Sequence, residues 1–509
     1  MARGMAIALW AKLIPEAPAI VAPDGTRSFA QLNARCNQLA RALRARGLRA
    51  GDGVALLCTN RCEFAEVFWT TRRTGMRLTT INWHLTPDEA AYIVEDCDAK
   101  ALFVDARLHE LAGALHGRSP RLQLEVAMGG SLAGYSDYEE LLAGHSGADL
   151  EDPLLGTHML YTSGTTGRPK GVHRPPVPVA PSPTAIAADY QPGSSVHLLT
   201  GPLYHAAPLS FSMGVPHAFG AGVVMMDGWD AEQALGLIQE HAVTHSHMVP
   251  TMFHRLLSLP EPTRRSYDLS TLRFVLHGAA PCSVPLKRGM IEWLGPIIHE
   301  YYAATEGAGT SVDALTWLQK PGTVGRPNPD DHVKILDENG RALPAGEIGQ
   351  VYLKSPEYGR FNYYKDSDKT ERAYRGAYYT LGDLGYLDGD GYLFLTDRSA
   401  HLIISGGVNI YPAEIEAVLL THPAIADVGV IGVPNNEWGE EVKAVATLQR
   451  GWVRSPQLMG ELIDYCRGRL AHYKCPRSVD FVDELPRHDN GKLYKHKLRE
   501  SYRPRPPES

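Results

Sequence analysis

The sequence lacks three features that would point to a function class at once. Its seven cysteines are an odd number without a Cys-x-x-Cys pair, so we expect reduced, mostly buried thiols. No apolar run is long enough to span a membrane. Positive charge is not in excess, because the formal net charge is -7, and a role in binding nucleic acid is therefore disfavoured.

The beginning of the chain also lacks the pattern of a secretory signal. Its apolar run is broken by Lys12 and Pro15 and is too short for the core of such a signal. We therefore expect a cytoplasmic protein. A peripheral contact with a membrane and a homodimer stay open as alternatives.

What is present is a long chain of ordinary globular composition, with 509 residues, of which 44% are hydrophobic. Such a length predicts two or more domains. Apolar residues at steps of three and four predict a helix over 29–43, and Thr86 and Glu89 form the capping pattern of another helix. Short apolar runs alternate with helical stretches and predict strands at 54–58, 78–81, 101–104, 196–199, 223–226, 245–249, 274–277 and 297–301. This alternation predicts an α/β fold with doubly wound, largely parallel sheets.

The pattern of predicted helices and strands changes twice in the second half of the sequence. From about Gly322, short strands and turns such as Asp388-Gly389-Asp390-Gly391 predict a smaller, β-rich subdomain. After Arg398, helices over 412–420 and 458–470 flank a strand over 427–433, which predicts a small α+β domain.

The most informative stretch is Tyr161-Thr162-Ser163-Gly164-Thr165-Thr166-Gly167-Arg168-Pro169-Lys170-Gly171. Its hydroxyls, backbone N–H groups and one ammonium can converge on phosphate oxygens, and its glycines allow close approach. Composition alone favours an ordinary surface loop over any function. The Walker A pattern fails, because Pro169 replaces its second glycine and Gly171 replaces the hydroxyl that follows lysine.

This stretch resembles the phosphate loop of the adenylate-forming superfamily, and the ordered motifs that follow resemble its fatty-acyl-CoA ligase branch. The resemblance implies that Thr162, Ser163, Gly164, Thr165, Thr166, Gly167 and Lys170 bind ATP. It also implies a division into an acyl- and ATP-binding domain over 1–397 and a mobile domain over 398–509. The hinge is expected near 398–401.

Further motifs follow at the predicted ends of strands, where open α/β sheets bind ligands. Glu300-Tyr301-Tyr302-Ala303-Ala304-Thr305-Glu306 resembles the family's Y-G-x-T-E motif, with Ala303 in place of glycine. The resemblance implies that Tyr302 stacks on adenine, Thr305 contacts the α-phosphate, and Glu306 and Thr162 help to hold Mg²⁺. Gly278, Ala279 and Ala280 match a loop that flanks the nucleotide.

The C-terminal motifs complete the set. Asp383 and Arg398 are implied ribose ligands, and an acidic residue suits ribose hydroxyls. Gly406 and Gly407 lie in a loop that lets the CoA arm pass, and Lys492, in Pro486-Arg487-His488-Asp489-Asn490-Gly491-Lys492, is the implied catalytic lysine.

These motifs predict an AMP-forming acid-CoA ligase that converts an apolar acid of medium or greater length to its adenylate and then to its CoA thioester. The implied catalytic residues are Lys492, Thr305, Glu306, Lys170 and His205, and the implied acyl pocket contains His205, Met213, Met248, Ala279 and Ala303. Two alternatives stay open: an enzyme that loads a carrier protein, and an inactive binding protein. A metal site at His241, His245 and His247 is disfavoured, because no carboxylate or cysteine completes a ligand set.

Overall fold

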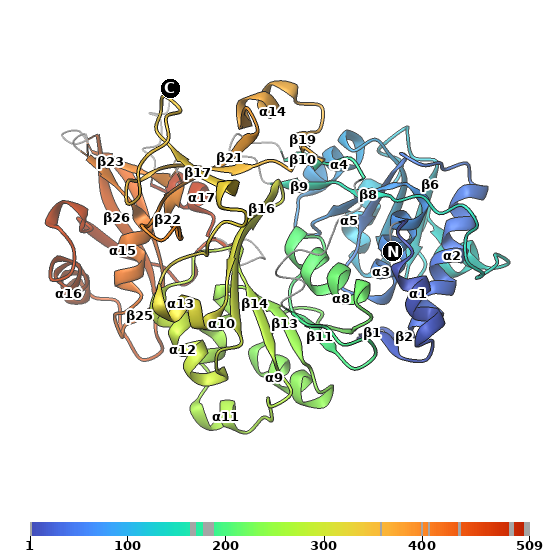
Figure 1. Ribbon diagram of the computed structural model, residues 1–509, viewed down its shortest axis with the longest axis horizontal. Coiled ribbons are helices and arrows are strands. Elements are labelled where there is room, and N and C mark those ends of the chain that lie inside the picture. The colour runs from blue at the N-terminus through green and yellow to red at the C-terminus, as the bar shows by residue number, and fades with distance from the viewer. Residues whose placement is uncertain are drawn as a thin grey trace.

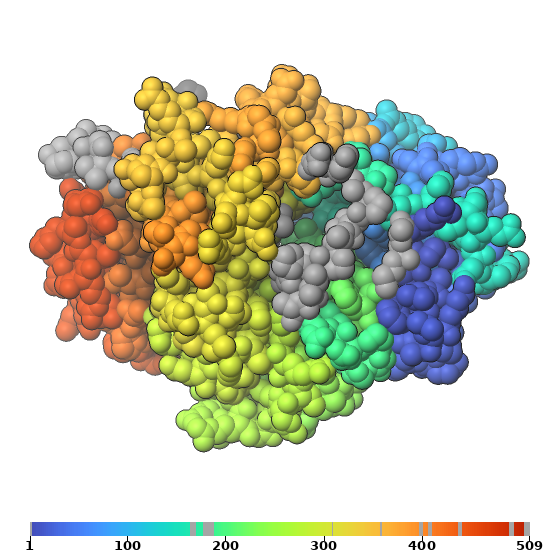
Figure 2. Space-filling view, viewed as in Figure 1, coloured from blue at the N-terminus to red at the C-terminus, as the bar shows by residue number. Residues whose placement is uncertain are grey.

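The computed structural model describes residues 3–162, 169–176, 188–356, 359–398, 401–405, 408–435, 439–487 and 493–502. Figure 1 shows two N-terminal sheets, a β-rich subdomain above one of them, and a separate C-terminal sheet. In the space-filling view of Figure 2 the first residues and the C-terminal part occupy opposite ends of the molecule. The predicted fold class is therefore confirmed, whereas the boundary after residue 397 stays a prediction.

The first sheet is entirely parallel and has six strands. Their spatial order is β7 (Ser136–Asp137), β6 (Leu124–Met128), β5 (Ala99–Asp105), β3 (Gly53–Leu57), β4 (Arg77–Ile81) and β8 (Thr157–His158). One face packs on α4 (Pro87–Asp96) and α5 (His109–Leu115). The predicted cap of α4 is confirmed, because Glu89 N donates to Thr86 Oγ1 and the Glu89 carboxylate accepts from Thr86 N.

The second sheet has eight strands and is parallel except at its two edges. Their order is β16 (Gly307–Val312), β15 (Ile298–Ala304), β14 (Phe274–His277), β13 (His245–Met248), β11 (Val196–Leu199), β12 (Gly222–Met225), β1 (Pro18–Ala22) and β2 (Gly25–Ser28). The N-terminal hairpin β1–β2 was not predicted, because its partner strand β12 is about two hundred residues away.

Helices form three layers around these two sheets. The middle layer lies between them and contributes to a core with side chains from both sheets; it contains α1 (Ala6–Leu13), α2 (Phe29–Ala45), α3 (Cys62–Thr74), α6 (Tyr138–Leu142), the π-helix η2 (Pro208–Gly214) and α8 (Val215–Ala218). The outer layer on the second sheet contains α9 (Ala231–Glu240), α10 (Pro250–Leu257) and α12 (Val284–Leu294), with α11 (Glu261–Arg265) and α13 (Ala314–Gln319) nearby. All seven cysteines are unpaired, as expected.

The β-rich subdomain combines two small sheets. One contains β17 (Val333–Leu336), β18 (Gly349–Lys354), β21 (Tyr378–Leu387), β20 (Tyr374–Arg375) and β22 (Leu393–Arg398). The other contains β9 (Leu160–Thr162), β10 (Lys170–His173) and β19 (Asn362–Tyr363), followed by α14 (Ser367–Ala373). Strands from residues 160–173 and 362–363 therefore meet in one sheet.

The C-terminal sheet has its own core. Its strands are β24 (Val408–Ile410), β23 (Ile403–Ser405), β26 (Gly439–Leu448), β25 (Ile425–Asn435) and β27 (Ser478–Phe481), with α15 (Pro412–Leu419), α16 (Pro456–Arg467) and α17 (Lys495–Glu500). Helix α16 begins two residues before its predicted start, because Ser455 caps it and Pro456 fits its first turn. Among the described residues no helix is long and apolar enough to cross a membrane.

Candidate active site

The predicted phosphate loop begins and ends in the hairpin of β9 and β10. Thr162 lies opposite Lys170 in their antiparallel pairing. Lys170 Nζ donates to Asp366 Oδ2 at 2.7 Å, and this hydrogen bond raises the pKa of Lys170. The ammonium is therefore charged and held at the base of the hairpin. Five predicted residues lie outside the described part of the chain: Ser163, Gly164, Thr165, Thr166 and Gly167.

Strand β15 brings the second predicted motif close to β21 of the subdomain. Tyr302 OH donates to Asp383 Oδ2 at 2.6 Å, so the residue predicted to stack on adenine contacts the one predicted to bind ribose. The register between β15 and β16 shifts between Tyr302 and Ala303, and such irregularities re-aim side chains at the end of a strand. Thr305 and Glu306 follow in the turn to β16.

Glu306 is a buried carboxylate, with a relative exposure of 8%. Its Oε1 accepts a hydrogen bond from Tyr363 OH at 2.9 Å, and no lysine or arginine of the described residues forms an ion pair with it. Mg²⁺ prefers oxygen ligands, and both this carboxylate and the hydroxyl of Thr162 in the hairpin of β9 and β10 are groups of that kind. Within the described ranges no three His, Cys, Asp or Glu residues gather as metal ligands.

The predicted nucleotide loop after β14 is shaped by its close approach to β15. A Cβ atom on Gly278 would lie 2.6 Å from ring atoms of Tyr301, so only glycine fits there. Ala279 has a φ of +67°, a left-handed conformation that is strained for a residue other than glycine. Ala279 is exposed and Ala280 half-buried, as a loop beside a ligand requires.

A buried ion pair, which sequence reasoning missed, anchors this loop. Lys287 Nζ of α12 donates to Glu300 Oε2 at 2.7 Å, and the two side chains are 0% and 8% exposed. His277 Nε2 lies 3.6 Å from the same oxygen. Burial raises the pKa of Glu300 and lowers that of Lys287. Because His277 and Glu300 pair in the sheet, the cluster joins both predicted nucleotide segments to α12.

Three more residues that the sequence did not indicate lie on the segment that runs from β19 into α14. Tyr363 contacts Glu306, Asp366 contacts Lys170, and Lys369 Nζ lies 4.3 Å from the ring centroid of Tyr363. Burial and the neighbouring Lys170 ammonium lower the pKa of Lys369. The segment has the composition of a surface turn, and Asp366 is 196 residues from Lys170, so no local pattern signals these contacts.

The residues predicted to line the acyl pocket do not share one cluster. Met213 is in the core between the two large sheets, whereas Met248 packs with α9, α10 and α12. Ala303 packs against a third cluster, Ala279 is exposed, and His205 is half-buried after β11. Met248 and its neighbour in β13, His247, point to opposite faces of the sheet, so the two side chains enter different cores.

The third cluster is an aromatic and small-residue wall between the second sheet and η2–α8. It contains Ala188, Tyr190, Ala221, Phe274, Leu276 and Tyr301, with Ala207, Phe211, Val215, Phe219 and Ala303 packed against it. Its cavity has a volume of about 10 Å³, close to the space of one water molecule. An acyl chain that enters must therefore displace side chains such as Phe211. The local sequence around these residues does not distinguish them from other hydrophobic core residues.

The histidines of β13 are buried and hydrogen-bonded in this wall. His245 Nε2 pairs with Ala188 O at 2.5 Å, and His247 Nε2 pairs with Tyr301 OH at 3.0 Å. Burial lowers the pKa of each to about 4. They are neutral polar groups of the core at ordinary pH.

The structure describes only some of the residues that were predicted in the C-terminal motifs. Gly406, Gly407 and Lys492 lie outside the described residues, as does the side chain of Arg398, although its backbone pairs with Asp383 between β22 and β21. Arg487, five residues before Lys492, forms two hydrogen bonds with Asp427, at 2.6 and 2.7 Å. The chain that carries Lys492 is thus tied to β25.

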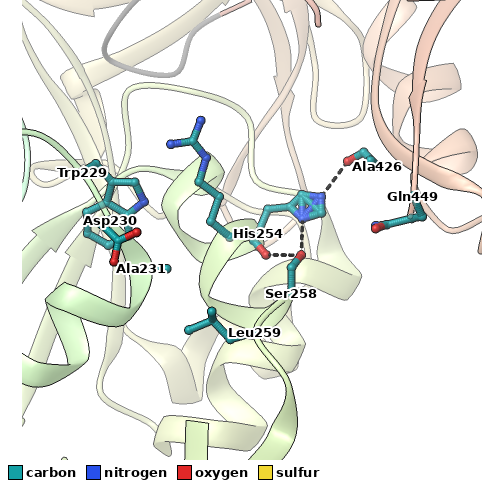
Figure 3. Close-up of a pocket in the computed structure, with 9 residues that line it drawn as sticks. Trp229, Asp230, Ala231, His254, Ser258, Leu259, Ala426 and Gln449 are labelled. Atoms are coloured by element: carbon teal, nitrogen blue, oxygen red, sulfur yellow. Dashed lines mark hydrogen bonds between the residues drawn. The ribbon is translucent and has the colours of Figure 1, made fainter. Parts of the chain in front are cut away.

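A larger cavity, of about 410 Å³, lies where the C-terminal part meets α9 and α10 (Figure 3). His254 Nε2 contacts Ala426 O across it at 2.6 Å, and Ser258 Oγ lies beside the same imidazole. Its lining includes Trp229, Asp230 and Gln449 but none of the predicted site residues. The cavity therefore belongs to the contact between the two parts rather than to the candidate site.

Comparison with known proteins shows the same organisation along the whole chain. The AMP-binding enzyme family matches residues 8–364, and the AMP-binding enzyme C-terminal domain matches residues 414–492. The chain is 34% identical to 2-succinylbenzoate–CoA ligase of Geobacillus kaustophilus over 494 residues, which cover 96% of this chain and 95% of that protein. It is 32% identical to the fatty acid–acyl-carrier-protein ligase ScoC of Streptomyces coeruleorubidus over 502 residues, covering 96% and 94%.

The fold is similar to that of the anthranilate CoA ligase AuaEII, crystallised with anthranoyl-AMP. The TM-score is 0.85 with 27% sequence identity, and the alignment covers 98% of this chain and 97% of that one. The similarity therefore extends over both the N-terminal and the C-terminal parts.

Proposed function

Because the chain belongs to the AMP-binding enzymes, the adenylate-forming family that includes AMP-forming acid–CoA ligases, we propose that it activates an apolar carboxylic acid of medium or greater length and transfers the acyl group to CoA. One observation carries the proposal: the predicted site residues of three separate segments are hydrogen-bonded to one another or to one short segment, Tyr302 to Asp383, Glu306 to Tyr363, and Lys170 to Asp366.

In the proposed first step, the substrate carboxylate attacks the α-phosphate of ATP and pyrophosphate leaves, which yields an acyl-adenylate. Asp383 would bind the ribose and Tyr302 the adenine, while Thr305 and the ammonium groups of Lys170 and Lys492 offset charge at the phosphates. When bound, Mg²⁺ would neutralise phosphate charge, and Glu306 and Thr162 would hold it. The chain's own contribution is thus orientation and electrostatic stabilisation.

In the proposed second step, the thiolate of CoA attacks the acyl carbon and AMP leaves. The loop with Gly406 and Gly407 would admit the CoA arm after the domain over 398–509 has rotated about 398–401, so that Lys492 no longer faces the site. The hydrogen bond between His254 Nε2 and Ala426 O would break in such a motion.

The apolar character of the substrate rests on the wall around Phe211, Phe274, Leu276 and Tyr301, because clusters of aromatic and small residues bind apolar groups. Relatives named for succinylbenzoate and for fatty acids support ring-bearing and chain-like acids alike. The relative named as an acyl-carrier-protein ligase also makes a carrier protein the second candidate acceptor.

The proposal is tested with Lys492→Ala, with the exposed Lys497→Ala as control. Pyrophosphate release from ATP plus acid should slow by roughly 100-fold or more in Lys492→Ala, as when a single preorganised donor is lost. CoA consumption from synthetic acyl-adenylate should stay near the unsubstituted rate, because the lysine has left the site by then. Unchanged pyrophosphate release would remove Lys492 from the mechanism.

The acyl group and the acceptor need a second measurement. Mass spectrometry of products from acetate, long-chain, aromatic and amino acids, each with CoA and with a phosphopantetheinylated carrier, should show the highest turnover with an apolar acid and CoA. Fastest turnover with acetate or an amino acid would contradict the proposed substrate. Product on the carrier alone would favour the second candidate.

A further inference from the structure

Lys369, in the first turn of α14, carries a half-buried ammonium group. Within the described part of the chain no carboxylate or carbonyl accepts a hydrogen bond from its Nζ; the group instead lies over the ring of Tyr363, 4.3 Å from the centroid. Burial lowers the pKa of Lys369 most, the cations Lys170 and Arg372 lower it further, and the carboxylates of Glu306 and Asp366 raise it. Two neighbouring ammonium groups repel each other, and an anion that contacts both would offset this repulsion in addition to Glu306 and Asp366.

The position of Lys369 is set by the residues that hold the candidate site. Tyr363 OH is hydrogen-bonded to Glu306, and the ring of the same tyrosine supports the Lys369 ammonium. Asp366 accepts the backbone N–H of Lys369 through Oδ1 and the ammonium of Lys170 through Oδ2. One short segment therefore places Lys369 between the proposed Mg²⁺ carboxylate and the lysine of the phosphate hairpin.

We propose that Lys369 is a second phosphate-binding cation, which together with Lys170 binds the β- and γ-phosphates of ATP and the pyrophosphate they become. The inference rests on the proposed function and adds a residue to its ATP site. The phosphate chain is the multiply charged anion of that reaction, and two ammonium groups suit it better than one. Lys170 must exchange Asp366 for phosphate, whereas Lys369 has no carboxylate partner to give up.

A simpler role for Lys369 is packing on Tyr363, and the two roles predict different results. Lys369→Met keeps most of the side-chain volume on the ring but removes the charge, whereas Lys369→Arg keeps the charge. Lys365→Met is the matched control, because Lys365 lies on the same segment and pairs with Asp98, away from Glu306.

The direct experiment is calorimetric titration of the full-length protein with inorganic pyrophosphate and magnesium. Lys369→Met should weaken pyrophosphate binding by roughly 10- to 100-fold, the range for losing one charge-assisted hydrogen bond. Lys369→Arg should keep binding within a few-fold, and Lys365→Met should match the unsubstituted protein. Equal affinity in Lys369→Met and the unsubstituted protein would overturn the inference.

Kinetics separates this inference from the proposed function. In Lys369→Met the KM for ATP should rise and inhibition by pyrophosphate should weaken, while CoA consumption from supplied acyl-adenylate stays unchanged. If Lys369 had a purely structural role, Lys369→Met would lower the rates of both half-reactions together. A loss confined to the ATP-dependent half-reaction would exclude that role. If no acid supports pyrophosphate release in the unsubstituted protein, the proposed function fails, whereas the calorimetric comparison still decides the role of Lys369.

Discussion

Replacing Lys287 by methionine should destabilise the protein strongly, because it leaves the Glu300 carboxylate buried without a counter-ion. The ammonium is 2.7 Å from Glu300 Oε2 and 4.7 Å from the ring centroid of Trp317, and its side chain is fully buried. His277 Nε2, at 3.6 Å, is the remaining polar neighbour of that oxygen. Methionine keeps the volume of the side chain but not its charge.

The magnitude follows from the burial of both partners. Removing one member of a buried ion pair costs about 3–5 kcal/mol, mostly for the charge that is left behind. At about 2 °C per kcal/mol for a large domain, the Tm should fall by roughly 6–10 °C. In the double variant Lys287→Met/Glu300→Gln no net charge stays buried, so at least half of this loss should be recovered.

Differential scanning calorimetry of the two single variants and the double variant measures this coupling. Lys100→Met is the control, because Lys100 pairs with Asp52 at the surface and such pairs contribute about 0–1 kcal/mol. If Lys287→Met lowered the Tm no more than Lys100→Met does, the argument from burial would be wrong. A double variant less stable than the sum of the single ones would refute the coupling.

Two further predictions concern acid stability and acyl selectivity. Trp69 Nε1 donates to His217 Nδ1 at 2.9 Å, His217 Nε2 pairs with Ala19 O, and burial lowers the pKa of His217 to about 4. Since this histidine takes up a proton near pH 6.5 in the unfolded chain, the stability that the neutral histidine contributes is complete above that pH and is lost on acidification toward pH 4. The loss in free energy of unfolding is roughly 2 kcal/mol at pH 5. Calorimetry at pH 7.5 and 5 should therefore show a smaller Tm decrease in His217→Gln than in the unsubstituted protein, and an equal decrease would contradict the assignment. Phe211→Ala should enlarge the cavity of about 10 Å³, and kcat/KM for a longer acid, divided by that for a shorter acid, should rise by about 10-fold or more. If pyrophosphate-release assays showed an unchanged ratio, Phe211 would not contact the acyl group.

Features that depend on neighbours along the chain could be predicted from the amino-acid sequence. The spacing of apolar residues predicted the helix from Phe29 and the parallel strands, and Thr86 with Glu89 marked the start of α4. These signals are local, because a helix face and a cap are set within one or two turns. The predicted family is confirmed. It could be predicted because its motifs are short segments that follow one another in a fixed order.

Contacts between residues that are distant along the chain could not be predicted in this way. Lys170 reaches Asp366 across 196 positions, and Glu306 reaches Tyr363 across 57, so neither partner has a signature in its own neighbourhood. The residues predicted for the acyl pocket show the same dependence on packing, because strand alternation turns Met248 into the core with α9, α10 and α12 and away from the cluster against which Phe211 packs. Chain order indicates which motifs exist, whereas side-chain packing and strand register determine which of their atoms come into contact.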